Sequence, residues 1–210
     1  MRIASSVLFL LACLCAAQSP SAPGSPTSAS RGGVGEPQAT AAPGPAKMEN
    51  VSTLVQQQFG PRFTIPTKFP TVLIVADFDG DGVEDVAIVA DSRDPLSDSY
   101  DYKYTVSDPY YSFFGYGNPT NTVTFGRADP NHSHDLLIIF GAGADAWHAA
   151  TPKAKFVVIN VPFDEINVGR MLIKKGKPPI YVIKAMETRS MEDSAVFWDA
   201  KKKKWKWQPA

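Results

Sequence analysis

Four aspartates separated by glycines lie close together in the chain: Asp77, Asp79, Asp81 and Asp85. Side-chain oxygens at alternate positions of a tight loop can converge on one point, and Gly82 permits the backbone turn that this requires. Because calcium takes carboxylate and carbonyl oxygens as ligands, this spacing predicts a calcium site to which the Val83 carbonyl can contribute. The alternative is a solvated Asp-Gly turn that holds no ion.

The residues on both sides of this loop predict strands. Residues 71–76 and 86–90 are largely β-branched and apolar, so the aspartates would connect the two strands of a hairpin. An EF-hand loop opens with similar spacing, but it requires a bidentate glutamate at its twelfth position and a helix on each side. Ile88 occupies the twelfth position here, and the flanking segments favour strands, so the EF-hand interpretation fails.

This segment resembles the calcium-binding β-hairpin of FG-GAP and VCBS-type repeats, which occur in integrin α-subunits and in many exported bacterial proteins. The resemblance implies side-chain ligands at Asp77, Asp79, Asp81 and Asp85 and a backbone ligand at Val83. It also implies a structural ion, and hence a module that binds or scaffolds other molecules and is not an enzyme.

Two further segments carry a weaker resemblance to the same family. Phe140 and Gly141 are similar to the Phe-Gly strand end of a repeat, and the C-terminal segment from Trp198 onward is similar to the ending of some VCBS-type modules. The acidic loop has no second copy, and 210 residues leave room for only part of a propeller. We therefore expect the metal site without a complete propeller.

The N-terminal part of the chain predicts export. Residues 1–17 have a short charged start and an apolar core that is too short to span a bilayer. Two processing routes stay open: cleavage by a signal peptidase, or recognition of residues 10–13 as a bacterial lipobox with lipidation of Cys13. Residues 18–47 are rich in proline, alanine and serine and predict a disordered tether. The protein is thus expected in the periplasm or cell envelope, or secreted.

Composition restricts the partners that the protein could bind. The chain has 21 basic and 21 acidic residues, so no overall electric field attracts nucleic acid or an anionic membrane. Membrane attachment is expected only through a lipid on Cys13, and the expected partner is a protein or a carbohydrate. Both cysteines lie within the export signal, so the folded part has no disulfide.

Hydrophobic patterning predicts a single mainly β domain, of the β-rich α+β class, over residues 48–210. Apolar residues at helical spacing predict one short helix over residues 48–59. Short apolar runs separated by glycine and proline predict an antiparallel sheet or meander. Besides the acidic hairpin, the predicted strands are residues 135–140, 155–161, 168–174, 180–186 and 195–199. A C-terminal hairpin follows, with lysines at its turn and Trp205 and Trp207 on one face.

An aromatic insertion interrupts this pattern over residues 91–134. It contains six of the seven tyrosines of the chain, namely Tyr100, Tyr102, Tyr104, Tyr110, Tyr111 and Tyr116. Exposed tyrosine offers a large contact area at low entropic cost, so the segment is a candidate platform for a sugar or a protein partner. The competing interpretation is an insertion that is partly disordered or whose aromatic rings fold back over the sheet.

Two other groups of residues have ordinary structural explanations. His132, His134 and His148 lie near Asp135 in the sequence, but no third well-spaced ligand accompanies them, so a solvated loop is preferred to a transition-metal site. For the lysines at 201–204 and 206, interleaved with Trp205, protection of an edge hairpin against aggregation is preferred to a nucleic-acid or membrane-surface site. The preferred function is a non-catalytic, calcium-stabilised module, with an exported inhibitor or accessory subunit second and a secreted hydrolase third.

Overall fold

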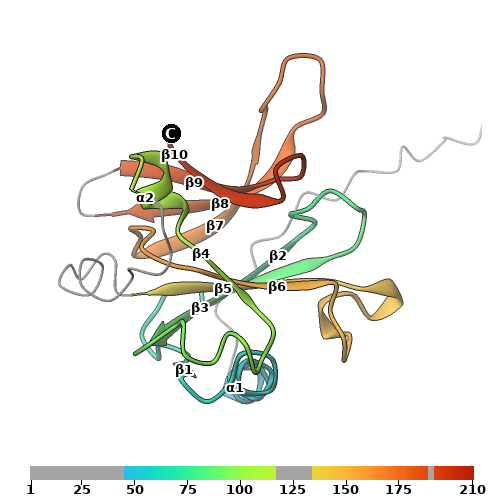
Figure 1. Ribbon diagram of the computed structural model, residues 1–210, viewed down its shortest axis with the longest axis vertical. Helices are drawn as coiled ribbons and strands as arrows, with labels where there is room; N and C mark the ends of the chain where they lie inside the picture. The colour runs from blue at the N-terminus through green and yellow to red at the C-terminus, as the bar shows by residue number, and fades with distance from the viewer. Residues whose placement is uncertain (1–44, 117–133, 189–191) are drawn as a thin grey trace, which may run out of the picture. The chain divides into compact units, whose positions relative to one another are not determined.

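A computed structural model describes residues 45–116, 134–188 and 192–210 (Figure 1). Two β-sheets and few helices confirm the predicted β-rich α+β class. In the described part of the chain, the strands close into neither a barrel nor a propeller. The predicted export signal with Cys13 lies outside the described residues, as do residues 18–44 of the tether and the part of the aromatic insertion at 117–133. Residues 45–47, predicted as the end of the disordered tether, belong instead to the first helix, Pro45–Phe59.

The first sheet is antiparallel except at one edge. Its strands are β1 (Phe63–Thr64), β2 (Leu73–Ala76), β3 (Asp85–Ser92), β4 (Thr105–Ser107), β5 (Asp135–Phe140) and β6 (Ala154–Val158). The order is β1-β3-β5-β6-β4, and β2 also pairs with β3. The exception is β4, which runs parallel to β6. The acidic hairpin is thus the β2–β3 connection, as predicted.

The second sheet is an antiparallel meander. Its strands are β7 (Glu165–Met171), β8 (Ile180–Glu187), β9 (Glu192–Asp199) and β10 (Lys204–Pro209), paired in chain order. The predicted strand 168–174 is displaced from β7 because Leu172 and Ile173, although apolar, lie in the connection to β8 and are exposed. The C-terminal hairpin is confirmed, with Trp205 and Trp207 buried on one face.

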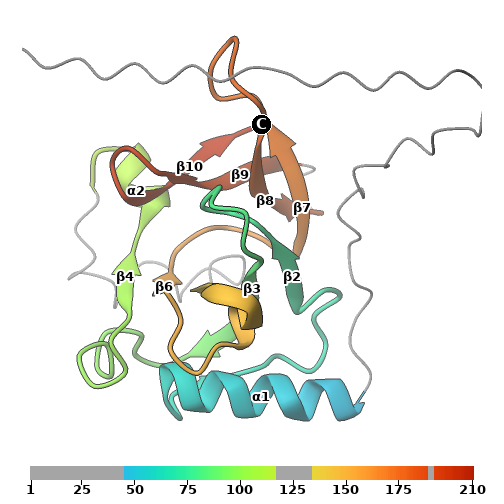
Figure 2. The same ribbon diagram turned by 90° about the vertical axis from the view of Figure 1, so that its right-hand side faces the viewer.

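Helix α1 (Pro45–Phe59) covers the outer face of the first sheet. Its buried residues Val51, Val55 and Phe59 are four positions apart and therefore lie on one side of the helix. The second sheet packs on the opposite face of the first, so the domain has three layers (Figure 2). The predicted helix over residues 48–59 is confirmed.

Two central strands explain the strongest patterns in the sequence. β3 and β5 contribute alternate residues to both cores: Ile138 faces the second sheet, whereas Leu137 and Ile139 face α1. Strands covered on both faces need apolar residues at successive positions, not at every second one. This is why residues 136–140 form a continuous apolar run.

The first half of the aromatic insertion is folded back onto the domain. It contains β4 and the short helix α2 (Pro109–Phe113), neither of which was predicted. Tyr104 is only 5% exposed, and its hydroxyl donates a hydrogen bond to the Pro95 carbonyl at 3.0 Å. A third unpredicted element, the 3₁₀ helix η3 (Gly143–His148), follows β5.

Candidate metal site

The acidic loop connects the end of β2 to the start of β3 at the edge of the first sheet. Its two glycines, Gly80 and Gly82, have φ angles of 81° and 87°. Nothing lies within 4 Å of where a Cβ would stand at either position, so the requirement for glycine comes from the backbone conformation and not from lack of space. These two residues let the loop turn tightly enough to bring its carboxylates together.

The aspartates organise the backbone of the loop. Every backbone N–H from residue 78 to residue 83 donates to an aspartate carboxylate. Asp77 accepts from Gly80, Asp81 and Gly82 at 2.8 to 3.0 Å. Since an ionised carboxylate has about four lone-pair sites, Asp77 retains capacity for one further donor or cation.

Asp85 ties the loop to the neighbouring strand. Its carboxylate is buried and accepts from the N–H groups of Phe78 and Gly141, each at 2.8 Å, and from Asp79 at 3.2 Å. A side chain at position 141 would be blocked, because a Cβ there would lie 2.3 Å from the Glu84 carbonyl oxygen. The end of β5 is therefore fixed against the loop by one hydrogen bond and one close backbone approach.

Three of the four aspartates converge. Carboxylate oxygens of Asp77, Asp79 and Asp85 all lie within 4.8 Å of one another. Asp81 is outside this group, because its oxygens accept from the Val83 N–H at 2.9 Å and from Lys153 at 2.6 Å. Oxygen donors of this kind suit a hard cation such as calcium or magnesium, not a metal that prefers sulfur ligands.

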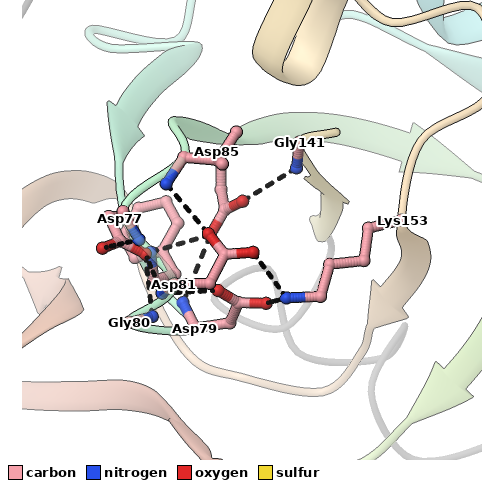
Figure 3. A network of polar contacts seen from close by, with 10 residues as sticks. Asp77, Asp79, Gly80, Asp81, Asp85, Gly141 and Lys153 are labelled. Carbon is pink, nitrogen blue, oxygen red and sulfur yellow. Dashed lines mark hydrogen bonds and ion pairs between the residues drawn. The ribbon is translucent and has the colours of Figure 1, made fainter. Parts of the chain in front are cut away.

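Lys153 is the cation that the structure places at this loop, and the sequence did not indicate it. Its Nζ lies 2.5 Å from Asp79 Oδ2 and 2.6 Å from Asp81 Oδ2, bridging two carboxylates (Figure 3). Lys153 is 72 residues from Asp81 along the chain, so no local pattern could have found the pair. Four carboxylates facing one ammonium group leave the site with a net negative charge.

Three pKa values are shifted at the loop, two by charged hydrogen-bond partners and one by burial. Hydrogen bonding by Lys153, followed by the Val83 N–H, lowers the pKa of Asp81. The same contacts with Asp79 and Asp81 raise the pKa of Lys153. Burial raises the pKa of Asp85 to about 7, and this exceeds the opposite effect of its backbone donors. A cation bound beside Asp85 would favour the ionised carboxylate and lower that pKa.

The predicted aromatic platform is only partly on the surface. Tyr100 and Tyr116 are 90% and 79% exposed. Tyr102, Tyr110 and Tyr111 are half-buried, and Tyr110 packs on Trp207 with ring centroids 4.9 Å apart. The buried ring of Tyr104 cannot contact a partner in this fold, which corrects the expectation of six available tyrosines.

Within the described ranges, His134 and His148 do not join a group of side chains that could hold a metal. His134 Nδ1 lies 2.6 Å from Asp91 Oδ1, and the exposed ring of His148 stacks on Trp147. His132 lies outside the described residues. Asp135 accepts instead from the Ser92 hydroxyl at 2.6 Å. Among the described residues, the acidic triad is the group of three or more side chains that could hold a metal.

Comparison with protein-family models, curated proteins and solved structures finds no match to this chain. None of the helices in the described residues has the length and apolar character needed to cross a membrane.

Proposed function

We propose that the protein is an exported, non-catalytic calcium-binding module of the FG-GAP/VCBS type, in which the ion is structural. The observation that carries the proposal is the convergence of Asp77, Asp79 and Asp85 oxygens within 4.8 Å in a loop whose backbone is already held by its own carboxylates. Such a loop needs little further ordering to accept an ion.

In this proposal the ion is held by Asp77, Asp79 and Asp85, with Asp81 and the Val83 carbonyl completing the oxygen set. Asp81 becomes available to the ion when Lys153 is displaced, because Lys153 and the ion compete for the same carboxylate. Calcium is preferred to magnesium because calcium accepts six to eight oxygens in flexible geometry, whereas magnesium demands a near-ideal octahedron.

The proposed role of the ion is to stabilise the joint between β2, β3 and β5. Asp85 connects the loop to Gly141 at the end of β5, so an ion on Asp85 acts on three strands of the first sheet. An ion at one hundred times its dissociation constant adds about 2.7 kcal/mol to the native state. Extracellular calcium modules typically have dissociation constants on the order of 10⁻⁴ to 10⁻³ M.

Partner binding at the cell envelope is the expected use of such a module. The aromatic rings of Phe113, Phe114 and Tyr116 are exposed beside α2, and Phe113 packs against Trp207 with ring centroids 5.1 Å apart. An exposed aromatic group of this kind suits a protein or a carbohydrate. These exposed rings support a proposed contact surface around α2 that is smaller than the full tyrosine-rich segment.

Thermal unfolding with and without calcium tests the stabilising role. For a chain of this size, about 2.7 kcal/mol corresponds to a rise in Tm of roughly 5 to 10 °C. We expect this rise for the wild type when calcium is present at about one hundred times its dissociation constant, roughly 10 to 100 mM, relative to EDTA. We expect a smaller rise in magnesium, and none for the double variant Asp79→Ala, Asp81→Ala. Equal Tm values for the wild type in calcium and in EDTA would remove the proposal.

A further inference from the structure

The connection between β7 and β8 is an exposed apolar and basic hairpin tip. Pairing of the two strands stops at Met171 opposite Ile180, and all of residues 172–179 beyond it are exposed. Leu172 and Ile173 are 58% and 50% exposed, and they are the exposed large aliphatic side chains of the described residues. Both Figure 1 and Figure 2 show this hairpin projecting from the second sheet.

A tight turn at the tip presents three lysines. The Lys177 N–H donates to the Lys174 carbonyl at 3.1 Å, and Gly176 has a φ of 80°, the geometry of a type II turn. This turn exposes Lys174, Lys175 and Lys177. Residues 166–186 contain basic residues and no aspartate or glutamate. None of the three turn lysines forms an ion pair within the described residues.

The second sheet places further lysines at the same end. In an antiparallel meander the first and third turns lie at one end, so the β9–β10 turn with Lys201, Lys202 and Lys203 shares the end of the β7–β8 tip. These lysines are exposed, whereas Lys206 is paired with Asp199 at 2.9 Å. A chain with balanced total charge thus carries a local excess of positive charge at this end.

We propose that the β7–β8 tip, residues 172–179, docks the protein onto an anionic lipid surface. The lysines attract the acidic headgroups, and burial of Leu172 and Ile173 at the boundary between headgroups and acyl chains adds favourable free energy. Nucleic acid would bind the lysines through its phosphates, but it would not use two exposed aliphatic side chains, because bases stack on aromatic rings. The tryptophans of the adjacent hairpin, Trp205 and Trp207, are buried and do not supply such rings.

Vesicle binding by the full chain tests the inference, in EDTA so that the result does not depend on calcium. Binding to phosphatidylcholine vesicles measures the background, including any contribution of the apolar N-terminus, and vesicles with 30% phosphatidylglycerol measure the anionic preference. Each lysine near an acidic surface contributes about fivefold, so Lys174→Glu, Lys175→Glu, Lys177→Glu should weaken phosphatidylglycerol binding by at least about a hundredfold.

Two further variants separate lipid docking from simple charge attraction. Leu172→Ser, Ile173→Ser should weaken phosphatidylglycerol binding roughly tenfold without changing the net charge. The control Lys201→Glu, Lys202→Glu, Lys203→Glu makes the same charge change at a turn without exposed aliphatic residues, and should lose less. All substitutions lie beyond the paired residues of their strands, so the Tm of each variant should match the wild type.

Three results would overturn the assignment. Equal binding of the wild type to both vesicle types would show that the anionic preference is absent. Equal losses in the two lysine variants would show attraction by overall charge. Undiminished binding of the serine variant, combined with displacement of the protein from vesicles by a DNA oligonucleotide, would indicate a nucleic-acid surface instead.

Discussion

A methyl group added at position 141 should force the acidic loop away from β5. In Gly141→Ala the new Cβ would lie 2.3 Å from the Glu84 carbonyl oxygen and 2.8 Å from the Ala146 carbonyl carbon. Both are backbone atoms and cannot rotate aside, so overpacking should cost about 1–3 kcal/mol. The displacement also strains the 2.8 Å hydrogen bond from Gly141 to Asp85. Above the Asp85 pKa of about 7 this is a bond to a charged group, worth about 1.5–3 kcal/mol.

Together these effects predict a loss of about 4 kcal/mol in the free energy of unfolding. At roughly 2–4 °C per kcal/mol for a chain of this size, the Tm should fall by about 8–16 °C in EDTA, measured by circular dichroism. Gly143→Ala is the matched control. The new methyl group at position 143 has open space around it. The free energy of unfolding should therefore fall only by the strain of an alanine at a φ of 61°, about 1 kcal/mol. A fall in Tm for Gly141→Ala no larger than that of the control would refute the proposed close approach.

Two other substitutions probe the charges of the loop. Asp85→Asn keeps one acceptor oxygen but puts an amide N–H₂ group beside backbone donors. It should lower the free energy of unfolding by about 1–3 kcal/mol, measured with denaturant, and weaken calcium binding at least tenfold. Unchanged calcium affinity would exclude Asp85 as a ligand. Lys153→Gln removes the cation that competes with calcium for Asp79 and Asp81. It should strengthen calcium binding by only about two- to tenfold in a fluorescent-indicator competition assay, because half-exposed ion pairs contribute little free energy. Weaker calcium binding would instead make Lys153 a residue that supports the site.

Much of the fold follows from local sequence patterns. Apolar runs at β3 and β5 are visible because those strands are covered on both faces, and α1 is visible because its buried residues repeat every four positions. Two of the elements that were not predicted, β4 and α2, are short and lie among polar and aromatic residues. Their positions depend on contacts with β6 and β10, which are distant in the chain.

The candidate site was also predictable only in part. The spacing of the four aspartates predicts that Asp77, Asp79, Asp81 and Asp85 all converge, whereas in the structure three of them do and Asp81 is paired with Lys153. Lys153 could not be found from spacing, because it reaches the loop only through the folding of the first sheet. At Leu172 and Ile173 the sequence pattern predicted too much. These two apolar residues were interpreted as part of a strand, although they are exposed and lie beyond its end.

A calorimetric calcium titration of the wild type beside the double variant Asp79→Ala, Asp81→Ala tests the proposed calcium site directly. We expect one calcium ion bound per wild-type chain, with a dissociation constant on the order of 10⁻⁴ to 10⁻³ M, and no binding heat for the variant. Absence of heat for the wild type, or identical traces for both proteins, would contradict a calcium site in the β2–β3 loop.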